Sequence, residues 1–411
     1  MNTAKALRYT SMAAIVIILG ALTFWYFFIQ AKQEKVMGED AARGAGLAPP
    51  SLGSIVGSTY ENIISSLSTL VSGDGGPESG ELPRLSQVGK TPTAGLGFVG
   101  NASSTRLRFV ERSTGYIFDV DPTTGTLERL TNTLIPYVYE AIVAKKGVIL
   151  RGADDTNTIT TVVGTISASS STSANANPLV QRALPDGIRA IATSPTGDEV
   201  VYINGGEGVF TGSRVTWDGA KPQHLFSSNL SGWQIRLALK DRTVIVQKPS
   251  DNVAGSAYVV GGGGTLLPLI RDVQGLTVLP SASSKALLYG ESSGSLSLFV
   301  RADDTSTSER LPIRTIADKC TWDHGTKPVA YCAVPQGIPP ADFLDSRNRG
   351  ETHTADAWWK VDAGAASAEL LFSPGSAELD VENPVVDDEG NYIAFINARD
   401  KTLWLLRIAE N

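Results

Sequence analysis

The C-terminal stretch of the chain, residues 383–408, alternates short apolar runs with polar turns. It predicts three strands, at 384–387, 392–397 and 402–407, separated by Asp-Glu-Gly-Asn and Ala-Arg-Asp turns. A sheet of three strands would leave the edge of the last strand unpaired, which folded proteins avoid because open backbone groups invite aggregation. We therefore expect a fourth strand from elsewhere in the chain, and residues 81–87 are the predicted partner.

A similar apolar-basic strand recurs along the chain at intervals of about 44 residues, with two longer gaps. Each recurrence opens a unit that continues with a loop, a strand, a polar turn, a β-branched strand, another turn and a further strand. The recurrences are residues 82–87, 127–132, 179–184, 223–227, 266–270, 309–313 and 369–372. Four strands in about 44 residues is the period of a β-propeller blade.

Hairpins fill the space between these recurrences. They are expected within residues 106–121, 148–163, 199–217, 243–260, 285–301, 329–361 and 392–407. There are seven recurrences and seven hairpins, and each hairpin has its own fourth strand only if the first recurrence, at residues 82–87, pairs with the last hairpin, at residues 392–407. This pairing joins the two ends of the β region and closes a ring. The alternative is a sandwich or two smaller β domains, but neither predicts one period throughout with the missing strand at the opposite terminus. The predicted fold is an all-β, seven-bladed β-propeller at residues 81–411, whose last blade is completed by an N-terminal strand.

Composition and charge agree with this architecture. The chain has 411 residues, including 41 glycines and 21 prolines, with 19% charged residues. Such a composition suits an all-β protein rich in turns better than a helical one. The net charge is −7 and no basic block lies in the predicted folded part, so we expect no nucleic-acid partner.

An apolar segment near the N-terminus predicts a membrane anchor. Residues 11–29 carry no charge and are long enough to cross the bilayer as a helix, and Trp25 and Tyr26 fit an interfacial belt. A cleaved signal peptide is the alternative, but the apolar run is longer than usual and no clear small-x-small site follows it. We expect a cytoplasmic N-terminus at residues 1–10 and a transmembrane signal anchor at residues 11–30.

Between this anchor and the propeller, residues 31–80 are rich in Gly, Ser, Ala and Pro, as in a flexible linker. Apolar residues at helical spacing interrupt the linker and predict a short amphipathic helix near residues 56–71. Its polar face lacks the Lys and Arg of a membrane-surface helix. We expect it to pack on the β domain or on a second copy of itself.

The two cysteines predict the compartment. Cys320 and Cys332 fall in two strands of the sixth blade, and a hairpin turning at residues 324–327 brings them directly opposite each other. Opposed residues on antiparallel strands have the separation that a disulfide needs. Two free thiols are the alternative, but an anchored chain favours the disulfide. Because positive charges flank both sides of the anchor, the cysteines decide its orientation, and they place the propeller outside the cytoplasm.

Two segments of the chain resemble a known family. Ser-Pro-Thr-Gly-Asp-Glu-Val-Val-Tyr-Ile at 194–203 and Asp-Glu-Gly-Asn-Tyr-Ile-Ala-Phe-Ile at 388–396 are similar to the turn-and-strand core of TolB-like, WD-type propeller repeats. The run Leu-Glu-Arg-Leu-Thr at 127–131 resembles the fourth strand of that repeat. The middle blades depart from the Ser-Pro-Asp-Gly form. The resemblance implies a propeller that often lies outside the cytoplasm and often serves as a binding platform.

Motifs for chemistry are weak in this sequence. Residues 290–294 match G-x-S-x-G, but they lie between two expected strands, whereas that motif needs a strand-to-helix elbow. The glycines at 261–264 predict a hairpin turn, since no helix follows them to hold a phosphate. Asp119 with Asp121, and the acidic run at 387–389, fit propeller turns as well as Ca²⁺ ligands. We expect no catalytic set, no metal site and no cofactor.

One insertion stands out. Residues 335–356 lengthen the loop between the second and third strands of the sixth blade, on the face that carries the blade-to-blade connections. Loops of this length without regular structure are often functional, and Arg and Trp are frequent at binding hot spots. The predicted binding residues are Phe343, Asp345, Arg347, Arg349 and Trp358. The alternative is a loop that packs over the channel mouth with its tryptophans in the core.

These features predict a membrane-anchored, extracytoplasmic propeller that acts as a binding scaffold for an envelope protein or a glycan. The alternative is an extracytoplasmic hydrolase or lyase with acidic residues at the channel mouth, since propellers also host such sites. That alternative requires carboxylates, such as those of Asp345, Glu351 and Asp388, to converge in one pocket with perturbed pKa values.

Overall fold

The computed structural model describes residues 82–409 apart from short gaps at 102–103, 154–157, 167–177, 195–196, 207, 238–241 and 304–306. The predicted anchor at residues 11–30 and the linker helix near residues 56–71 lie outside this part of the chain. Within the described part, no helix is both long and apolar enough to cross a membrane.

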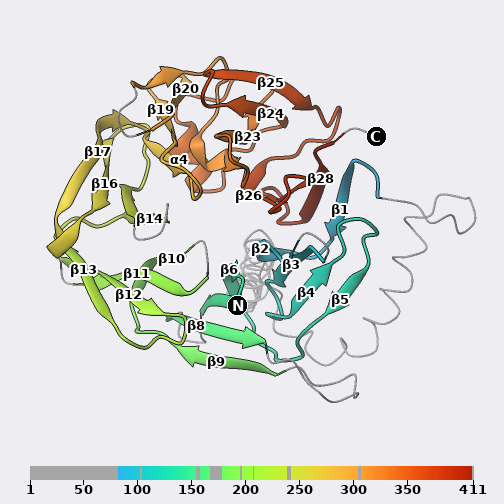
Figure 1. Ribbon diagram of the computed structural model, residues 1–411, viewed down its shortest axis with the longest axis vertical. Coiled ribbons are helices and arrows are strands. Elements are labelled where there is room, and N and C mark those ends of the chain that lie inside the picture. Colours follow the sequence, from blue (N-terminus) through green and yellow to red (C-terminus); the bar gives the residue numbers. More distant parts are fainter. Residues whose placement is uncertain are drawn as a thin grey trace, which may run out of the picture. The chain divides into compact units, whose positions relative to one another are not determined.

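Seven four-stranded antiparallel sheets are arranged as blades around a central axis, as Figure 1 shows. Blade 1 consists of β2 (Thr93–Val99), β3 (Arg106–Glu111), β4 (Ile117–Val120) and β5 (Leu127–Arg129). Blade 2 consists of β6 (Val138–Ala144), β7 (Gly147–Ala153), β8 (Ile159–Ile166) and β9 (Leu179–Ala183). Blade 3 consists of β10 (Ile188–Thr193), β11 (Glu199–Gly206), β12 (Val209–Thr216) and β13 (Gln223–Ser228). Blade 4 consists of β14 (Trp233–Leu237), β15 (Thr243–Gln247), β16 (Ala254–Val260) and β17 (Leu266–Gln274).

The remaining blades follow the same order from the axis outward. Blade 5 consists of β18 (Thr277–Pro280), β19 (Leu287–Ser292), β20 (Leu296–Arg301) and β21 (Glu309–Arg310). Blade 6 consists of β22 (Cys320–Trp322), β23 (Val329–Pro335), β24 (Asp356–Asp362) and β25 (Ser367–Phe372). Blade 7 consists of β26 (Val381–Val386), β27 (Tyr392–Asn397), β28 (Leu403–Arg407) and β1 (Leu85–Gly89). The described helical segments are η2 (Gly262–Gly264), η3 (Ala317–Lys319) and α4 (Phe343–Asn348). The predicted seven-bladed propeller is confirmed.

Ring closure takes place between the two ends of the propeller. β1 pairs antiparallel with β28, with Leu85 opposite Leu406 and Gln87 opposite Trp404. The predicted closing strand is therefore confirmed, although β1 begins and ends later than residues 81–87. Because one sheet contains both ends of the propeller, neither end presents an open strand edge within blade 7.

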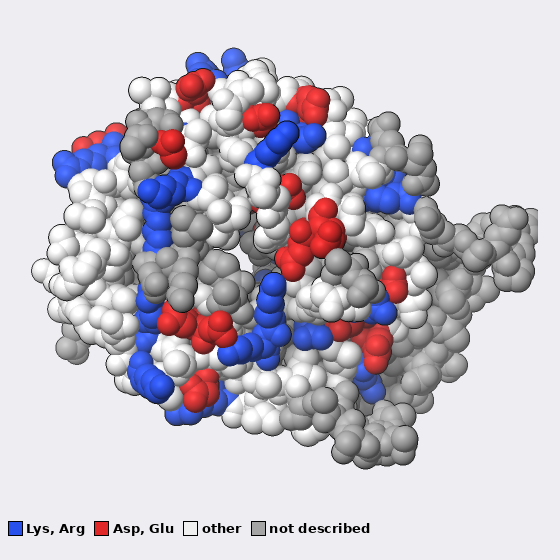
Figure 2. Space-filling view, viewed as in Figure 1, with Lys and Arg blue, Asp and Glu red and all other residues white. Residues whose placement is uncertain are grey.

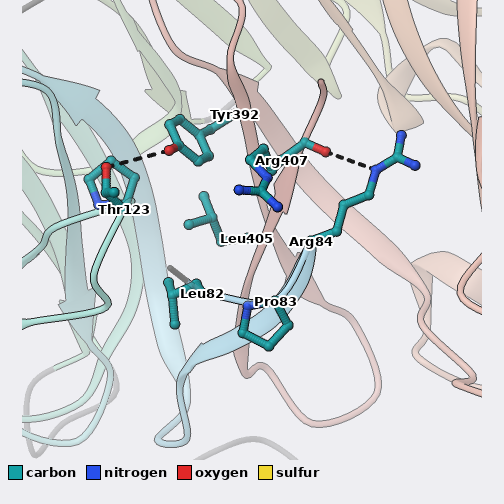
Figure 3. A pocket seen from close by; sticks show the side chains of 8 residues that line it. Leu82, Pro83, Arg84, Thr123, Tyr392, Leu405 and Arg407 are labelled. Carbon is teal, nitrogen blue, oxygen red and sulfur yellow. Dashed lines mark hydrogen bonds between the residues drawn. The ribbon is translucent and has the colours of Figure 1, made fainter. Parts of the chain in front are cut away.

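Hydrogen bonds from the chain just before β1 reinforce this closure (Figure 3). The Arg84 guanidinium donates hydrogen bonds to the backbone oxygens of Arg407 (3.3 Å), Leu371 (3.1 Å) and Ile408 (3.2 Å). The Leu82 N–H donates to the Thr123 carbonyl of blade 1 over 3.1 Å. The entering chain is thus bound to blades 6, 7 and 1 at once, and three blades hold it before it pairs with β28.

Burial explains why the strands form as they do. Middle strands are apolar and almost fully buried, as in β15 (TVIVQ) and β27 (YIAFIN), whereas the outer strand β5 is exposed along its length. The hydrophobic clusters lie between blades and not within them: Ile149 of blade 2 packs with Tyr202 of blade 3, and Trp358 of blade 6 with Phe395 of blade 7. Each blade therefore buries its faces against its neighbours, which is why blades do not form singly.

Blade 6 contains the disulfide. Cys320 of β22 lies directly opposite Cys332 of β23 in the strand register, and the two form a disulfide bond that confirms the predicted pairing. Both cysteines are buried, with 3% and 0% exposure. The bond fastens the short innermost strand of the blade to its longer neighbour.

The strand order defines two faces of the ring. The innermost strands all begin on one face, which also carries the blade-to-blade connections and the loops between second and third strands; we call it the connection face. The opposite face carries the turns between first and second strands, and we call it the turn face. The long loop between β23 and β24 lies on the connection face, as expected, and contains α4.

Candidate functional site

A buried ion cluster lies on the connection face between blades 6 and 7. Lys319, directly before β22, is 0% exposed, and its ammonium contacts the carboxylates of Asp356 and, at 2.6 Å, Asp380. The same ammonium donates to the Thr354 hydroxyl over 2.7 Å. A buried charge is tolerated only when it is paired and hydrogen-bonded, and here one cation faces two carboxylates. Burial lowers the pKa of Lys319, and Asp356 opposes that effect.

The insertion of blade 6 is fastened to this cluster. We call residues 336–355 the strap. Arg347 of the strap pairs with the Asp380 carboxylate and donates to the Val381 carbonyl over 3.0 Å, and His353 Nδ1 lies 3.0 Å from Asp380 Oδ2. Burial alone would raise the pKa of Asp380, but Lys319 and Arg347 overcome it and hold that pKa far below its usual range.

The other end of the strap is fastened to blade 4. The Asp345 carboxylate of α4 accepts hydrogen bonds from Ser250 Oγ (3.0 Å), the Asp251 N–H (3.2 Å) and Asn252 Nδ2 (3.1 Å). Phe343 and Leu344 are buried in an apolar cluster with side chains of blade 5 and of the connection that follows it. The strap therefore covers the connection face from blade 4 to blade 7.

The predicted binding residues thus have different surroundings. Phe343 and Trp358 are 0% and 2% exposed and pack in hydrophobic clusters. Asp345 and Arg347 fasten the strap, as described above. Arg349 is more than half exposed and pairs with Glu351 over 2.8 Å. Their role in recognition stays a prediction, and among the five only the Arg349 side chain is presented to solvent to that degree.

A pocket opens beside the strap, at the channel mouth between blades 7, 1 and 2. Its volume is about 290 Å³, close to the lower end of the range for small-molecule sites. Its lining comes from the first residues of three innermost strands, from the end of the second strand β27 and from two loops between second and third strands: Thr93, Ala94, Arg112, Tyr139, Glu140, Glu382, Asn383, Ile396 and Lys401. We call it the mouth pocket. Figure 2 shows one face of the molecule, with acidic and basic side chains interspersed around the centre of the ring.

Charges in the mouth pocket are arranged in pairs. The Lys401 ammonium lies 2.5 Å from the Glu382 carboxylate, and Arg151 of β7 pairs with Glu140. Arg112 donates to the Tyr139 carbonyl over 2.6 Å. Burial lowers the pKa of Arg112 and the Glu382 carboxylate opposes this effect. The pocket therefore offers preorganised donors and acceptors, held in place by ion pairs on neighbouring strands.

The backbone around the mouth pocket departs from regular geometry. Each of the three innermost strands that reach it has a shift in pairing register near its start: Thr93/Gly95 in β2, Val138/Glu140 in β6 and Glu382/Val385 in β26. Six non-glycine residues in the described ranges have positive φ, and two of them, Asn383 (49°) and Lys401 (60°), line the pocket. Bulges and strained backbone gather next to functional sites.

The acidic residues named for the enzyme alternative do not meet in one place. Asp345 is bound to the blade 4 loop and Glu351 pairs with Arg349. Asp388 lies in a turn between first and second strands, where it is 3.3 Å from Lys145 and 4.0 Å from His324. These carboxylates therefore form no common site. The carboxylates that do share a pocket are Glu140 and Glu382.

The Gly-x-Ser-x-Gly segment lies where the sequence places it, between two strands. Ser292 ends β19, is buried, and donates to Asp251 Oδ1 over 2.6 Å. Asp251 Oδ2 in turn accepts from the Asp345 N–H over 3.0 Å. Ser292 thus supports the loop that holds the strap.

Sequence reasoning missed the mouth pocket. Its lining residues are spread from residue 93 to residue 401, and each is unremarkable in its local segment. Two signals were present: a glutamate near the start of an otherwise apolar innermost strand at both Glu140 and Glu382, and the Asn383-Pro384 pair inside a strand. A proline inside a strand indicates a bulge or an edge.

Comparison with known proteins shows the fold. No protein-family model and no curated protein matches the chain. Among solved structures, a catalytically inactive virginiamycin B lyase from Staphylococcus aureus with quinupristin is similar at 12% identity and a TM-score of 0.50, covering 79% of this chain and 99% of that one. TolB from Acinetobacter baumannii is similar at 9% identity and a TM-score of 0.41, covering 86% and 70%. The chain is a seven-bladed β-propeller, and these distant similarities define no activity.

Proposed function

We propose that this protein is a membrane-anchored, extracytoplasmic propeller that binds a glycan in the mouth pocket. The observation that carries the proposal is the pocket itself: a polar concavity that three bulged innermost strands line with charged groups, hydroxyls and an amide. Sugars are recognised through many directional hydrogen bonds, which such a lining supplies.

A glycan suits the described surface better than a flat protein partner. Large exposed apolar side chains in the described ranges are distributed over several blades, for example Val180, Leu267 and Leu370 in three different outer strands. Scattered apolar residues are ordinary on protein surfaces, whereas protein-binding sites usually present contiguous patches. The aromatic residues of the insertion, Phe343 and Trp358, are buried and supply no such patch.

Two features support the proposed location. Residues 11–29 carry no charge and are long enough for an anchor. The disulfide between Cys320 and Cys332 favours an oxidising compartment, because cytosolic thiols are kept reduced. A reporter enzyme that folds only after export, fused after Asn411, tests this part: activity in intact cells is expected, and an inactive fusion would contradict it.

The binding proposal is tested with the full chain on an array of immobilised envelope oligosaccharides. The pocket variant is Glu140→Gln, which removes a carboxylate that is 41% exposed and paired with a buried arginine. Glu199→Gln is the matched control, because Glu199 is 40% exposed and faces Arg214 in blade 3, outside the mouth pocket. We expect the wild-type chain to be retained by one class of glycan. Glu140→Gln should weaken this retention, and Glu199→Gln should leave it unchanged. Absence of any retained glycan, or equal loss in both variants, would contradict the proposal.

The enzyme alternative retains one specific observation in its favour. Glu140 and Glu382 line the same pocket, and paired carboxylates can act as general acid and base in sugar chemistry. Incubating the retained glycan with the wild-type chain distinguishes the two functions. Cleavage that disappears in both Glu140→Gln and Glu382→Gln would establish a hydrolase or lyase, whereas an intact glycan supports the binding function.

A further inference from the structure

The bulges around the mouth pocket each insert one extra residue near the start of an innermost strand. In β6 the extra residue is Tyr139, because Val138 and Glu140 pair with consecutive residues of β7. In β2 it is Ala94, and in β26 it lies at residues 383–384. Each of these bulges contributes to the pocket lining. A bulge turns a side chain away from the regular alternation of its strand, which is a common device beside binding sites.

Tyr139 is presented to the pocket with one face of its ring already covered. Of the nine described residues that line the pocket, it is the one with an aromatic side chain. The Arg151 guanidinium lies over its ring, 5.4 Å from the centroid. Arg151 is itself buried and fixed, since it pairs with Glu140 and donates to the Ile188 carbonyl over 2.8 Å. The opposite face of the ring is therefore the one that a ligand can meet.

The backbone on either side of Tyr139 is held in place before any ligand arrives. Arg112 of blade 1 donates from its guanidinium to the Tyr139 carbonyl over 2.6 Å, and its own carbonyl accepts from the Val138 N–H over 3.1 Å. Tyr137, in the turn that leads into β6, has a φ of 61°, which residues other than glycine rarely adopt. Strain of this kind persists where the surroundings impose it and is frequent at binding sites.

The described residues of the pocket lining have balanced charges. Arg112 and Lys401 are its two cations, and Glu140 and Glu382 are its two carboxylates. Both carboxylates already have a cationic partner. A charged ligand would bring an ionic group into the pocket without a counter-charge reserved for it, which is costly. The lining therefore suits an uncharged ligand that forms hydrogen bonds.

We propose that the mouth pocket recognises a neutral sugar whose C–H face stacks on the ring of Tyr139. The C–H groups on the face of a sugar ring carry small positive partial charges, and the face of an aromatic ring is negative. Thr93 and Asn383 lie in the same lining and offer a hydroxyl and an amide to the sugar hydroxyls. This inference rests on the proposed glycan-binding function and specifies its ligand class and the residue that reads it.

The ligand class is tested on an array that carries three kinds of oligosaccharide of equal length. The neutral ones contain glucose, galactose or N-acetylglucosamine, the acidic ones contain uronic acid, and the cationic ones contain free amino sugars. The full chain is expected to be retained by a neutral oligosaccharide about tenfold more strongly than by a charged one. Equal or stronger retention by a charged class would overturn this inference and leave glycan binding in place. If nothing on the array retains the chain, the proposed function fails as well.

The role of Tyr139 is tested by titration calorimetry with the neutral oligosaccharide that the array retains most strongly. Tyr139→Leu removes the aromatic ring and keeps an apolar side chain, whereas Tyr139→Phe keeps the ring. Tyr289→Leu is the matched control, because Tyr289 is also partly exposed and has one ring face covered, by Phe299 at 5.1 Å. It lies in blade 5, outside the pocket lining. Thermal unfolding checks that each variant is folded.

Tyr139→Leu should weaken binding about fivefold or more, the usual contribution of a ring stacked on an aromatic side chain. Tyr139→Phe should retain most of the affinity, and Tyr289→Leu should bind as the wild-type chain does. Unchanged affinity in Tyr139→Leu, or an equal loss in Tyr139→Phe, would overturn the stacking role. A loss of the same size in Tyr289→Leu would also overturn it, because the effect would then not belong to the pocket.

Discussion

Two parts of the connection face contrast in how they use charged side chains. The ion cluster under the strap is buried completely: Lys319, Asp356 and Asp380 are each exposed by 1% or less. The mouth pocket, only a few residues further along β26, holds Glu382 and Lys401 at 35% and 27% exposure. Buried groups of the first kind hold the fold in one arrangement, whereas partly open pairs of the second kind can exchange with a ligand.

Backbone regularity follows the same division. The innermost strands of blades 4, 5 and 6 pair with their neighbours without a shift in register. Those of blades 7, 1 and 2 each contain a bulge, as does that of blade 3. Regular pairing is thus found in blades 4, 5 and 6, and shifted pairing in blade 3 and in the three blades that line the pocket. We propose that blades 4 to 6 form a structural side of the ring and that the mouth pocket forms its binding side, and each prediction below tests that division.

The largest effect is expected from the buried cluster. Lys319→Met leaves Asp356 and Asp380 buried with less positive charge, and removal of one partner of a buried ion cluster costs about 3–5 kcal/mol. Lys146→Met is the control, because Lys146 and Asp198 are each about half exposed and their pair should contribute at most about 1 kcal/mol. Denaturant unfolding measures both. Similar free energies of unfolding for Lys319→Met and Lys146→Met would contradict the view that the buried ion cluster stabilises the fold more than an exposed ion pair does.

The disulfide should stabilise the structural side without affecting the binding side. Replacement of both Cys320 and Cys332 by alanine removes a cross-link that closes a short loop, with an expected loss of about 3 kcal/mol in the chain-entropy model. Glycan affinity should stay at its wild-type value, because the mouth pocket lies between blades 7, 1 and 2. A parallel loss of affinity in a variant that remains folded would show that blade 6 controls the pocket.

Acid should weaken the strap cluster in a defined pH range. The pKa of Asp380 lies below its usual range in the folded state because Lys319 and Arg347 overcome the effect of burial. The unfolded chain therefore binds a proton at higher pH than the folded chain, and stability falls as pH decreases below about 4. Asp380→Asn should be less stable at neutral pH and lose less stability between pH 5 and pH 2. An unchanged acid slope in this variant would contradict the assignment.

The smallest effect is expected at the exposed end of the strap. Arg349 and Glu351 are more than half exposed, so Arg349→Gln should leave the free energy of unfolding almost unchanged. Its effect on glycan retention should be smaller than that of Glu140→Gln. The opposite order, measured on the same glycan array, would place recognition on the insertion, as the sequence analysis predicts for Arg349.

What the sequence predicted correctly depends on local periodicity. The seven-fold recurrence and the opposed cysteines follow from spacing along a few tens of residues. The closing strand of blade 7 follows from the absence of a fourth strand in the C-terminal unit. Strand ends were less accurate, since β21 has only two residues where residues 309–313 were expected. The bounds of most innermost strands, which line the channel, were not predicted, because the sequence patterns of these strands are short and irregular.

The sites were harder to predict because they depend on three-dimensional pairing. Nothing in the sequence of the insertion separates the buried Phe343 from the exposed Arg349, because the partners of α4 lie in other blades. The sequence around Lys319 does not distinguish it from a surface lysine, because its partners Asp356 and Asp380 lie 37 and 61 residues further along the chain. The positive φ of Lys401 is equally invisible, since it arises from how the turn before β28 meets β2.

Hydrogen exchange of the full chain, with and without the glycan that the array retains, tests the division of the connection face most directly. The account predicts slower exchange on ligand addition in residues 93–95, 112–116, 138–141 and 382–386, and no change in the strap at residues 336–355. Protection that appears in the strap and leaves those four segments unchanged would contradict it.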